Sequence, residues 1–234
     1  MQMIMDILAI IPAYNEASHI GRVVAGVCKR LPVLVVDDGS NDDTGKLAAT
    51  AGGTVLRQDP NQGKGKALRA GFQWALDHGF SAAITLDADG QHDPEDLPAF
   101  LQAYLEGGAD LIIGARDFSQ IPRVRRVANT LGRWIFSWSM GRVVLDNQSG
   151  YRLVSRRMMQ AALDSTEHGF QFEVEMILIC IQKGFRLEWV PIRTIYAGER
   201  SHIKPVQHLL EFTGMALRAR RQMRVFYRKL DRGR

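Results

Sequence analysis

The stretch Ala82-Ala83-Ile84-Thr85-Leu86-Asp87-Ala88-Asp89-Gly90-Gln91-His92 places a short apolar run directly before alternating acidic and amide side chains. The apolar run predicts a buried strand over 82–86. Asp87, Asp89 and Gln91 stand at every second position, so in an extended segment their side chains point to one side. Mg²⁺ and Mn²⁺ prefer such oxygen ligands and leave coordination positions for substrate phosphates, which predicts a metal site here. The alternative is an acidic turn in which Asp93 caps a helix starting near Pro94.

The first half of the chain alternates short β-branched runs with amphipathic segments. This order predicts an α/β fold with a Rossmann-like, mostly parallel sheet and helices on both faces. The 234 residues, 46% of them hydrophobic, suit a single domain. Strands are predicted over 7–11, 33–36 and 55–56, and helices over 20–31, 44–51 and 65–78. Beyond 113 we expect a loop with Arg116, helices over 125–138 and 172–183, and a strand over 186–196.

Polar residues follow the predicted strands at the edge where ligands bind in parallel sheets. Tyr14, Asn15 and Glu16 follow the first strand, and Asp37 and Asp38 follow the second. A carboxylate at a strand end can accept a hydrogen bond from a base N–H or a ribose hydroxyl. The competing interpretation of the second group is helix capping by neighbouring Ser40, Asp43 or Thr44.

The segment Asn61-Gln62-Gly63-Lys64-Gly65-Lys66-Ala67 opens a predicted helix. A helix N-terminus with small residues can approach a phosphate, and Lys64 adds positive charge. The segment lacks the Walker A spacing, and no G-x-G-x-x-G follows the first strand, which weakens kinase-like and dinucleotide-binding interpretations. Taken alone, the loop fits a solvated turn equally well.

Four motifs in order are similar to those of family-2 glycosyltransferases with the GT-A fold: 11–16 (IPAYNE), 35–40 (VVDDGS), 61–65 (NQGKG) and 87–92 (DADGQH). Gly114-Ala115-Arg116, Asp146-Asn147-Gln148-Ser149-Gly150-Tyr151-Arg152 and Tyr196-Ala197-Gly198-Glu199-Arg200-Ser201 resemble later motifs of the polyprenyl-phosphate mannosyl- and glucosyltransferases. Asn147-Gln148 stands where the mannosyltransferases have Pro-Thr, so GDP-mannose and UDP-glucose both stay open as donors.

The resemblance implies a role for each matching position. Asp87, Asp89 and Gln91 would hold the metal and the diphosphate, and Arg116 and Arg200 would face the donor and acceptor phosphates. Asp89, Arg116 and Arg200 are thus the expected catalytic residues. The expected substrate contacts are Pro12, Tyr14, Glu16, Asp37, Asp38, Lys64, Asp87, Ala88 and Arg126.

The implied reaction is metal-dependent transfer of a hexose, with inversion, to a polyprenyl or dolichyl phosphate. Such an acceptor is already an anion and needs no strong general base, and arginine forks suit its phosphate. A soluble hydroxyl acceptor would need a carboxylate base. Glu173 and Glu175 are the candidates, although acids also favour the first turn of a helix without any catalytic role.

The net charge is +5 and the pI is near 9.4. The excess of basic residues lies mostly in the second half of the chain. We expect a catalytic domain over 1–204 and a basic amphipathic helix over 205–234. Its apolar stripe would either lie on a membrane or pack on the domain or a second subunit. The stripe comprises Leu209, Phe212, Ala216, Ala219, Met223, Phe226 and Leu230.

Composition bounds the setting and the rival functions. No run approaches the roughly 20 apolar residues of a membrane span, and Cys28 and Cys180 lack metal or redox spacing, which predicts a peripheral protein on the cytoplasmic face. A homo-oligomer is compatible with the stripe, and no nucleic-acid partner is expected. A nucleotidyltransferase would need a glycine-rich basic loop after the first strand, and this loop is missing. The other rival is a non-catalytic basic module that binds a membrane surface or a nucleotide, and it leaves the Asp-x-Asp-x-Gln segment unexplained.

Overall fold

The computed structural model describes residues 6–116, 123–165, 171–193, 195 and 205–232, and in parts of three helices it describes the backbone alone. The elements, in chain order, are β1 (Ile7–Ala13), α1 (Ile20–Val27), β2 (Val33–Asp37), α2 (Thr44–Thr50), β3 (Thr54–Arg57), α3 (Lys64–Asp77), β4 (Ala82–Thr85), the 3-10 turn η2 (Pro94–Asp96), α4 (Leu97–Gly107), β5 (Leu111–Arg116), α5 (Arg123–Met140), β6 (Arg152–Ser155), α6 (Arg156–Leu163), α7 (Gln171–Gln182), β7 (Leu187–Ile192) and α8 (Pro205–Arg232).

The seven strands form one sheet in the order β3-β2-β1-β4-β6-β5-β7. Every neighbouring pair is parallel except those made by β6, which runs antiparallel to β4 and to β5. The prediction of a mostly parallel sheet is confirmed. The strand β6 and the helix α6 were not predicted, because the apolar run of β6 is too short to show a period. Arg116 ends β5 instead of lying in a loop, since Gly114 and Ala115 pair with β7.

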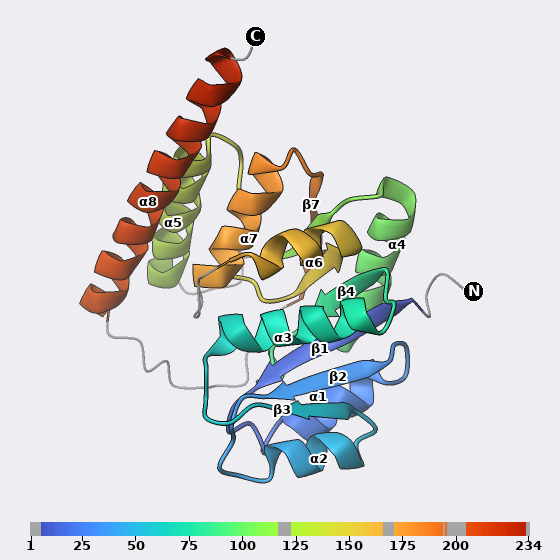
Figure 1. The fold of residues 1–234 in the computed structure, drawn as a ribbon. Coiled ribbons are helices and arrows are strands. Elements are labelled where there is room, and N and C mark those ends of the chain that lie inside the picture. The colour runs from blue at the N-terminus through green and yellow to red at the C-terminus, as the bar shows by residue number, and fades with distance from the viewer. Residues whose placement is uncertain (1–5, 117–122, 166–170, 194, 196–204, 233–234) are drawn as a thin grey trace.

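Helices cover both faces of the sheet, as predicted (Figure 1). Side chains of α1, α2 and α4 pack on one face with Ile7, Ala9 and Ile11 of β1. Those of α3, α5, α6, α7 and α8 pack on the other face, which includes Leu8 and Ile10. The strict alternation along β1 arises because successive side chains of a strand point to opposite faces.

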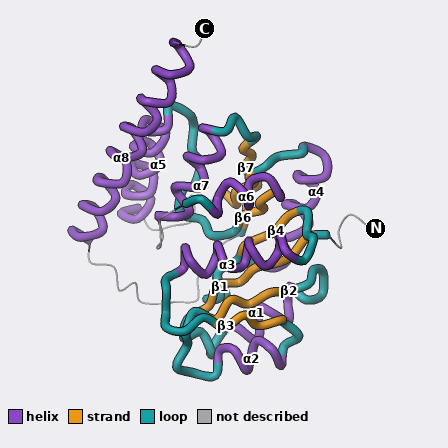
Figure 2. Tube along the Cα trace, in the orientation of Figure 1, coloured by secondary structure: helices purple, strands orange, loops and turns teal. Residues whose placement is uncertain are grey.

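The C-terminal helix α8 lies alongside α5 (Figures 1 and 2). Ala216, Ala219 and Met223 are buried in the core, and Phe226 packs against it. This described part of the predicted stripe therefore packs on the protein, which is the alternative that we weighed against a membrane contact. The side chains of Leu209, Phe212 and Leu230 lie outside the described residues. Within the described chain, no helix carries an apolar stretch that would reach across a bilayer.

Candidate active site

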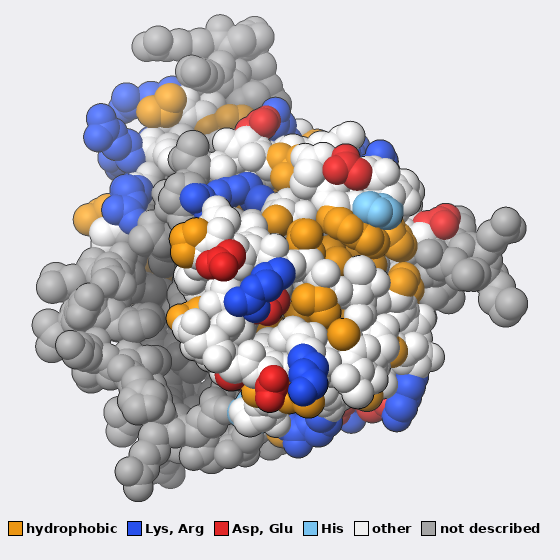
Figure 3. Space-filling model, turned by 60° about the horizontal axis from the view of Figure 1, so that its bottom comes forward, with side chains coloured by type: hydrophobic (Ala, Val, Ile, Leu, Met, Phe, Trp, Pro, Cys, Tyr) orange, Lys and Arg blue, Asp and Glu red, His pale blue; other side chains and the backbone are white. Residues whose placement is uncertain are grey.

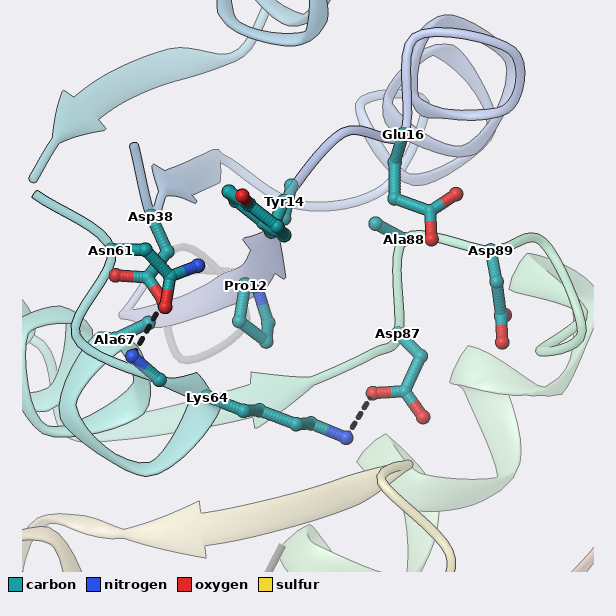
Figure 4. A pocket seen from close by; sticks show the side chains of 12 residues that line it. Pro12, Tyr14, Glu16, Asp38, Asn61, Lys64, Ala67, Asp87, Ala88 and Asp89 are labelled. Atoms are coloured by element: carbon teal, nitrogen blue, oxygen red, sulfur yellow. Dashed lines mark hydrogen bonds and ion pairs between the residues drawn. The ribbon is translucent and has the colours of Figure 1, made fainter. Parts of the chain in front are cut away.

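A pocket of about 290 Å³ opens where β1, β2 and β4 end. Seven of the predicted contacts line it: Pro12, Tyr14, Glu16, Asp38, Lys64, Asp87 and Ala88, together with Asp89. Ala13, Asn61, Gly63 and Ala67 complete the lining, and of these Asn61, Gly63 and Ala67 stand in the loop motif already noticed in the sequence. Figure 4 shows these side chains converging from three strand ends and from the start of α3. The topology of the sheet thus gathers polar groups that are far apart in the sequence.

The segment after β4 is a turn, not the extended run that the alternation suggested. Gly90 has a φ of 79°, and a Cβ there would lie 2.9 Å from Arg22 Nη2, so the turn needs glycine. Asp87 and Asp89 still line one pocket, and Gln91 N donates a hydrogen bond to Asp89 Oδ1 at 2.9 Å. Gln91 itself is not among the lining residues.

The capping interpretation of this region is also correct for one residue. Asp93 Oδ1 accepts a hydrogen bond from Glu95 N at 2.9 Å at the start of η2. The acidic run therefore serves two purposes: Asp93 begins a helical turn, and Asp87 and Asp89 face the pocket.

Asp87 lies at the centre of a network of charges. Lys64 Nζ is 2.5 Å from Asp87 Oδ1 and 2.8 Å from Glu173 Oε1, and His92 Nε2 is 3.2 Å from Asp87 Oδ2. Burial alone would lower the pKa of Lys64, but the carboxylates of Asp87 and Glu173 outweigh it and raise that pKa. Burial would likewise raise the pKa of Asp87, but Lys64 and His92 bring it below its usual range. The network therefore holds Lys64 charged and Asp87 ionised.

The 146–152 motif packs against Asp87 and the end of β4. A Cβ on Gly150 would lie 2.5 Å from Asp87 Oδ2, so only glycine leaves room for the carboxylate. The Thr85 hydroxyl donates to Gly150 O at 2.7 Å, which joins the motif to β4. Arg152 is fully buried and donates to Ser149 O at 2.8 Å and to Glu173 O. A guanidinium with several backbone acceptors thus links the start of α7 to the site.

The two adjacent aspartates at the end of β2 have different surroundings. Asp38 lines the pocket, and its oxygens accept hydrogen bonds from Gln62 N at 2.8 Å and Gly63 N at 2.7 Å. Asp37 is buried outside the pocket lining, where it accepts from Ser40 N at 2.9 Å and lies 2.7 Å from Arg57 Nη1. Of the pair, Asp38 is therefore the one that a ligand in the pocket would meet.

The start of α2 corrects the predicted cap. The Thr44 N–H donates to Asp42 Oδ1 at 3.0 Å, whereas Asp43, the residue at the cap position, makes no side-chain capping bond. Ser40 and Thr44 instead accept from the backbone of the first polar loop: Asn15 N donates to Ser40 Oγ at 3.0 Å and Glu16 N to Thr44 Oγ1 at 2.8 Å. These hydroxyls position the loop after β1 at the pocket.

Arg116 forms a two-pronged ion pair outside the pocket lining. Its Nε lies 2.6 Å from Asp146 Oδ2, and its Nη2 lies 3.0 Å from Asp146 Oδ1. Asp146 is buried and also accepts from the backbone of Gln148 and Ser149. Arg116 therefore holds the 146–149 turn, and its contact with a substrate phosphate stays a prediction. Arg200 and the side chain of Arg126 lie outside the described residues.

We predict that Arg116→Gln lowers the free energy of unfolding by about 2 kcal/mol, because Asp146 loses its cation. This value lies between the losses that are typical of exposed ion pairs and of fully buried ones. Adding Asp146→Asn should recover part of the loss. A double-mutant cycle in urea measures this coupling. Strictly additive effects would show that Arg116 does not support the turn, whereas a lost rate in a fully stable Arg116→Gln variant would favour a direct substrate role.

The site is suited to a metal ion that is held by protein carboxylates and by the oxygens of a diphosphate. Asp87, Asp89 and Glu16 bring carboxylates to one pocket, and Mg²⁺ or Mn²⁺ is commonly held by one or two carboxylates with phosphate oxygens and water. The described residues contain no group of three or more His, Cys, Asp or Glu side chains placed to enclose an ion. Asp87, Asp89 and Glu16 could supply part of a ligand set, with phosphate oxygens and water as the remainder.

A family model described as "Glycosyl transferase family 2" matches residues 8–166. Polyprenol monophosphomannose synthase of Mycolicibacterium smegmatis is 37% identical over 207 residues, covering 79% of this chain and 76% of the relative. Undecaprenyl-phosphate mannosyltransferase of Micrococcus luteus is 35% identical over 206 residues, covering 80% of this chain and 83% of the relative.

A solved structure shares the fold. Glucosyl-3-phosphoglycerate synthase from Mycobacterium tuberculosis, in complex with Mn²⁺, uridine diphosphate and glucosyl-3-phosphoglycerate, matches 94% of this chain and 79% of its own with a TM-score of 0.67. At 20% identity the likeness concerns the fold alone. The predicted GT-A-type architecture is confirmed.

Proposed function

This chain belongs to glycosyl transferase family 2 and is a glycosyltransferase, and we propose that it moves a hexose to a polyprenyl or dolichyl phosphate. The donor is a nucleoside diphosphate sugar, GDP-mannose or UDP-glucose, and the transfer inverts the anomeric centre. The observation that carries this proposal is the pocket in which Asp38, Lys64, Asp87 and Asp89 meet at the carboxyl ends of the strands. The names of the two mannosyltransferase relatives support the lipid-phosphate acceptor.

Different residues of the pocket would contact different parts of the donor. Pro12, Tyr14 and Asp38 border the side where the nucleoside would lie, and Asp89 lies at the other side (Figure 4). We propose that Asp87, Asp89 and Gln91 hold Mg²⁺ or Mn²⁺ with the diphosphate. When bound, the ion would neutralise the charge that grows on the departing diphosphate. Asp87 would act here while paired with Lys64, which keeps its carboxylate ionised.

The two candidate general bases are both engaged elsewhere. Glu173 is 3% exposed and ion-paired with Lys64, and Glu175 accepts a 2.5 Å hydrogen bond from the Ser165 hydroxyl. Neither residue lines the pocket. A hydroxyl acceptor needs a base within hydrogen-bond reach, whereas a phosphate acceptor attacks as an anion. Neither Glu173 nor Glu175 is therefore placed to serve as the base that a soluble hydroxyl acceptor would need.

The proposed step balances without a proton acceptor. A phosphate oxygen of the acceptor bonds to the anomeric carbon, and the bond from that carbon to the diphosphate breaks on the opposite face. The electron pair leaves with the nucleoside diphosphate. Arg116 and Arg200 stay our proposed partners for the phosphate charges, with Arg126 on the acceptor side.

A lipid acceptor implies contact with a membrane surface, which we propose is peripheral and on the cytoplasmic side. Cys28 and Cys180 are free thiols, and burial raises the pKa of Cys180 to about 12, so this thiol is unreactive at neutral pH. Buried, unpaired cysteines suit a reducing compartment. Assembly into a homo-oligomer and the absence of a nucleic-acid partner stay predictions.

The test offers GDP-mannose and UDP-glucose in turn, with Mn²⁺ and a short polyprenyl phosphate, and identifies the products by mass spectrometry. We expect a hexosyl phosphate lipid from one donor, and its loss when a chelator removes the metal. Nuclear magnetic resonance of the product reports the anomeric configuration. Sugar transfer only to hydroxyl compounds, or undiminished turnover in chelator, would contradict the proposal.

A further inference from the structure

Large apolar side chains are exposed on the outer side of α5 and α8. Trp134 and Trp138 are 67% and 49% exposed, and their spacing of four residues puts them on one face of α5. Leu217 on α8 is 62% exposed. Side chains of this size are normally buried, and their clustering on one surface is a sign of an interaction site.

Arginines form a row beside these apolar side chains. Arg221, Arg224 and Arg228 are exposed and follow Leu217 at steps of four, three and four, so the four residues share one face of α8. Arg220 joins the two helices, because its guanidinium lies 4.8 Å from the centre of the Trp138 ring and Nη1 donates to Trp138 O at 2.9 Å. The tryptophans of α5 and the arginines of α8 therefore belong to one continuous surface.

The charged residues of α5 and of this part of α8 have one sign, although Glu175 of α7 lines a groove together with Arg221. Residues 123–145 contain no Asp or Glu, and neither do residues 212–230. Elsewhere the charges are mixed: the face turned forward in Figure 3 shows acidic and basic side chains interspersed. A partner that complements the α5–α8 surface must be anionic and must also accept Trp and Leu side chains.

We propose that this surface, made of Trp134, Trp138, Leu217, Arg221, Arg224 and Arg228 and called here the α5–α8 face, docks on an anionic lipid bilayer. Tryptophan settles at the boundary between headgroups and acyl chains, and arginines beside it meet anionic headgroups. A duplex nucleic acid would also attract the arginines, but it offers no extended apolar layer for Trp134, Trp138 and Leu217 together. This docking surface rests on the proposed function, because a lipid-phosphate acceptor lies in a membrane that the protein must reach.

The α5–α8 face replaces the stripe expected from the sequence. Ala216, Ala219 and Met223 cannot enter lipid while they fill the core, whereas Leu217 and Arg224 lie outside it. Docking therefore needs no unfolding of α8 and leaves the pocket intact. The same helix supplies both the core contact and the lipid contact, through different faces.

The experiment measures partitioning of the full chain into vesicles of phosphatidylcholine with and without phosphatidylglycerol. We expect strong, salt-sensitive binding only with the anionic lipid. Arg221→Gln/Arg224→Gln should weaken partitioning about 30-fold, since two cations leave the surface. Trp134→Gln should weaken it about tenfold through lost apolar burial. The matched controls are Lys29→Gln/Lys46→Gln, with the same charge change, and Leu47→Gln, another exposed apolar residue; all three control sites are exposed.

Each outcome decides the matter. Equal losses in control and test variants, or equal binding to neutral and anionic vesicles, would overturn the proposal. So would binding to a duplex oligonucleotide in place of vesicles, which would assign the surface to nucleic acid. Transfer to a short, water-soluble polyprenyl phosphate is measured in parallel and should survive in every variant. If wild type shows no transfer yet the variants lose vesicle binding, the proposed function fails and the α5–α8 face stands.

Discussion

Asp89→Ala is expected to lower the rate of sugar transfer about 10²- to 10³-fold while leaving the fold intact. Asp89 lines the pocket beyond the end of β4, and its carboxylate is an oxygen ligand of the kind that Mg²⁺ and Mn²⁺ prefer. In the proposed mechanism the site stabilises the leaving diphosphate, and losing one such contribution costs about two to three decades in rate. The measurement is kcat with saturating donor, metal and acceptor.

The control for this variant comes from the same segment. Asp93 is also acidic but caps η2 and does not line the pocket, so Asp93→Ala should lose about 1 kcal/mol of stability and little rate. Thermal unfolding of both variants separates a chemical defect from a folding defect. An Asp89→Ala enzyme with wild-type kcat would remove Asp89 from the metal–diphosphate site.

Periodicity was sufficient to predict the framework of the fold, because β1, β2 and β4 are buried and continuous in sequence. It did not show β6, whose four residues become a strand only through pairing with β4 and β5. The turn at Gly90 was also hidden, since alternation of residue types does not specify the backbone. Sequence reasoning therefore succeeded where local patterns decide and failed where long-range pairing does.

The site shows the same division. The motifs located Asp38, Lys64, Asp87 and Asp89, because each stands at a strand end or a helix start. They did not reveal that Lys64 pairs with Glu173, since the contact joins the start of α3 to the start of α7 across the site. They also could not separate Asp37 from Asp38, which adjoin in sequence but differ in what surrounds them. Side-chain partners, unlike positions, came from the fold.

Lys64→Met is expected to lower the free energy of unfolding by about 3–5 kcal/mol at pH 7, because Asp87 and the buried Glu173 both lose the cation that they share. Lys64 Nζ lies within 2.8 Å of both Asp87 and Glu173, and Glu173 is 3% exposed. Transfer should fall as well, since Asp87 loses the contact that orients it. Urea unfolding gives the stability, and steady-state kinetics give the rate.

The pH dependence of this loss has a definite sign. Lys64 and His92 depress the pKa of Asp87, so the stability from this carboxylate is present above its unfolded pKa of about 3.9 and is lost as the pH falls through the folded value. The raised pKa of Lys64 adds stability below its unfolded value of about 10.4, which is lost only at strongly alkaline pH. The deficit of Lys64→Met should therefore be largest near neutrality and shrink below about pH 4, where Asp87 takes up a proton in the unfolded chain.

Lys66→Met is the matched control, because Lys66 lies in the same turn of α3 and its side chain only approaches Gln62 Oε1, at 3.5 Å. It should change stability by no more than about 0.5 kcal/mol. The comparison separates two roles of Lys64. If Lys64→Met raised KM for the donor yet unfolded like Lys66→Met at pH 7, Lys64 would be a phosphate ligand, as its place at a helix start suggested. A stability deficit that narrows below about pH 4 instead identifies it as the cation that holds Asp87 and Glu173 together.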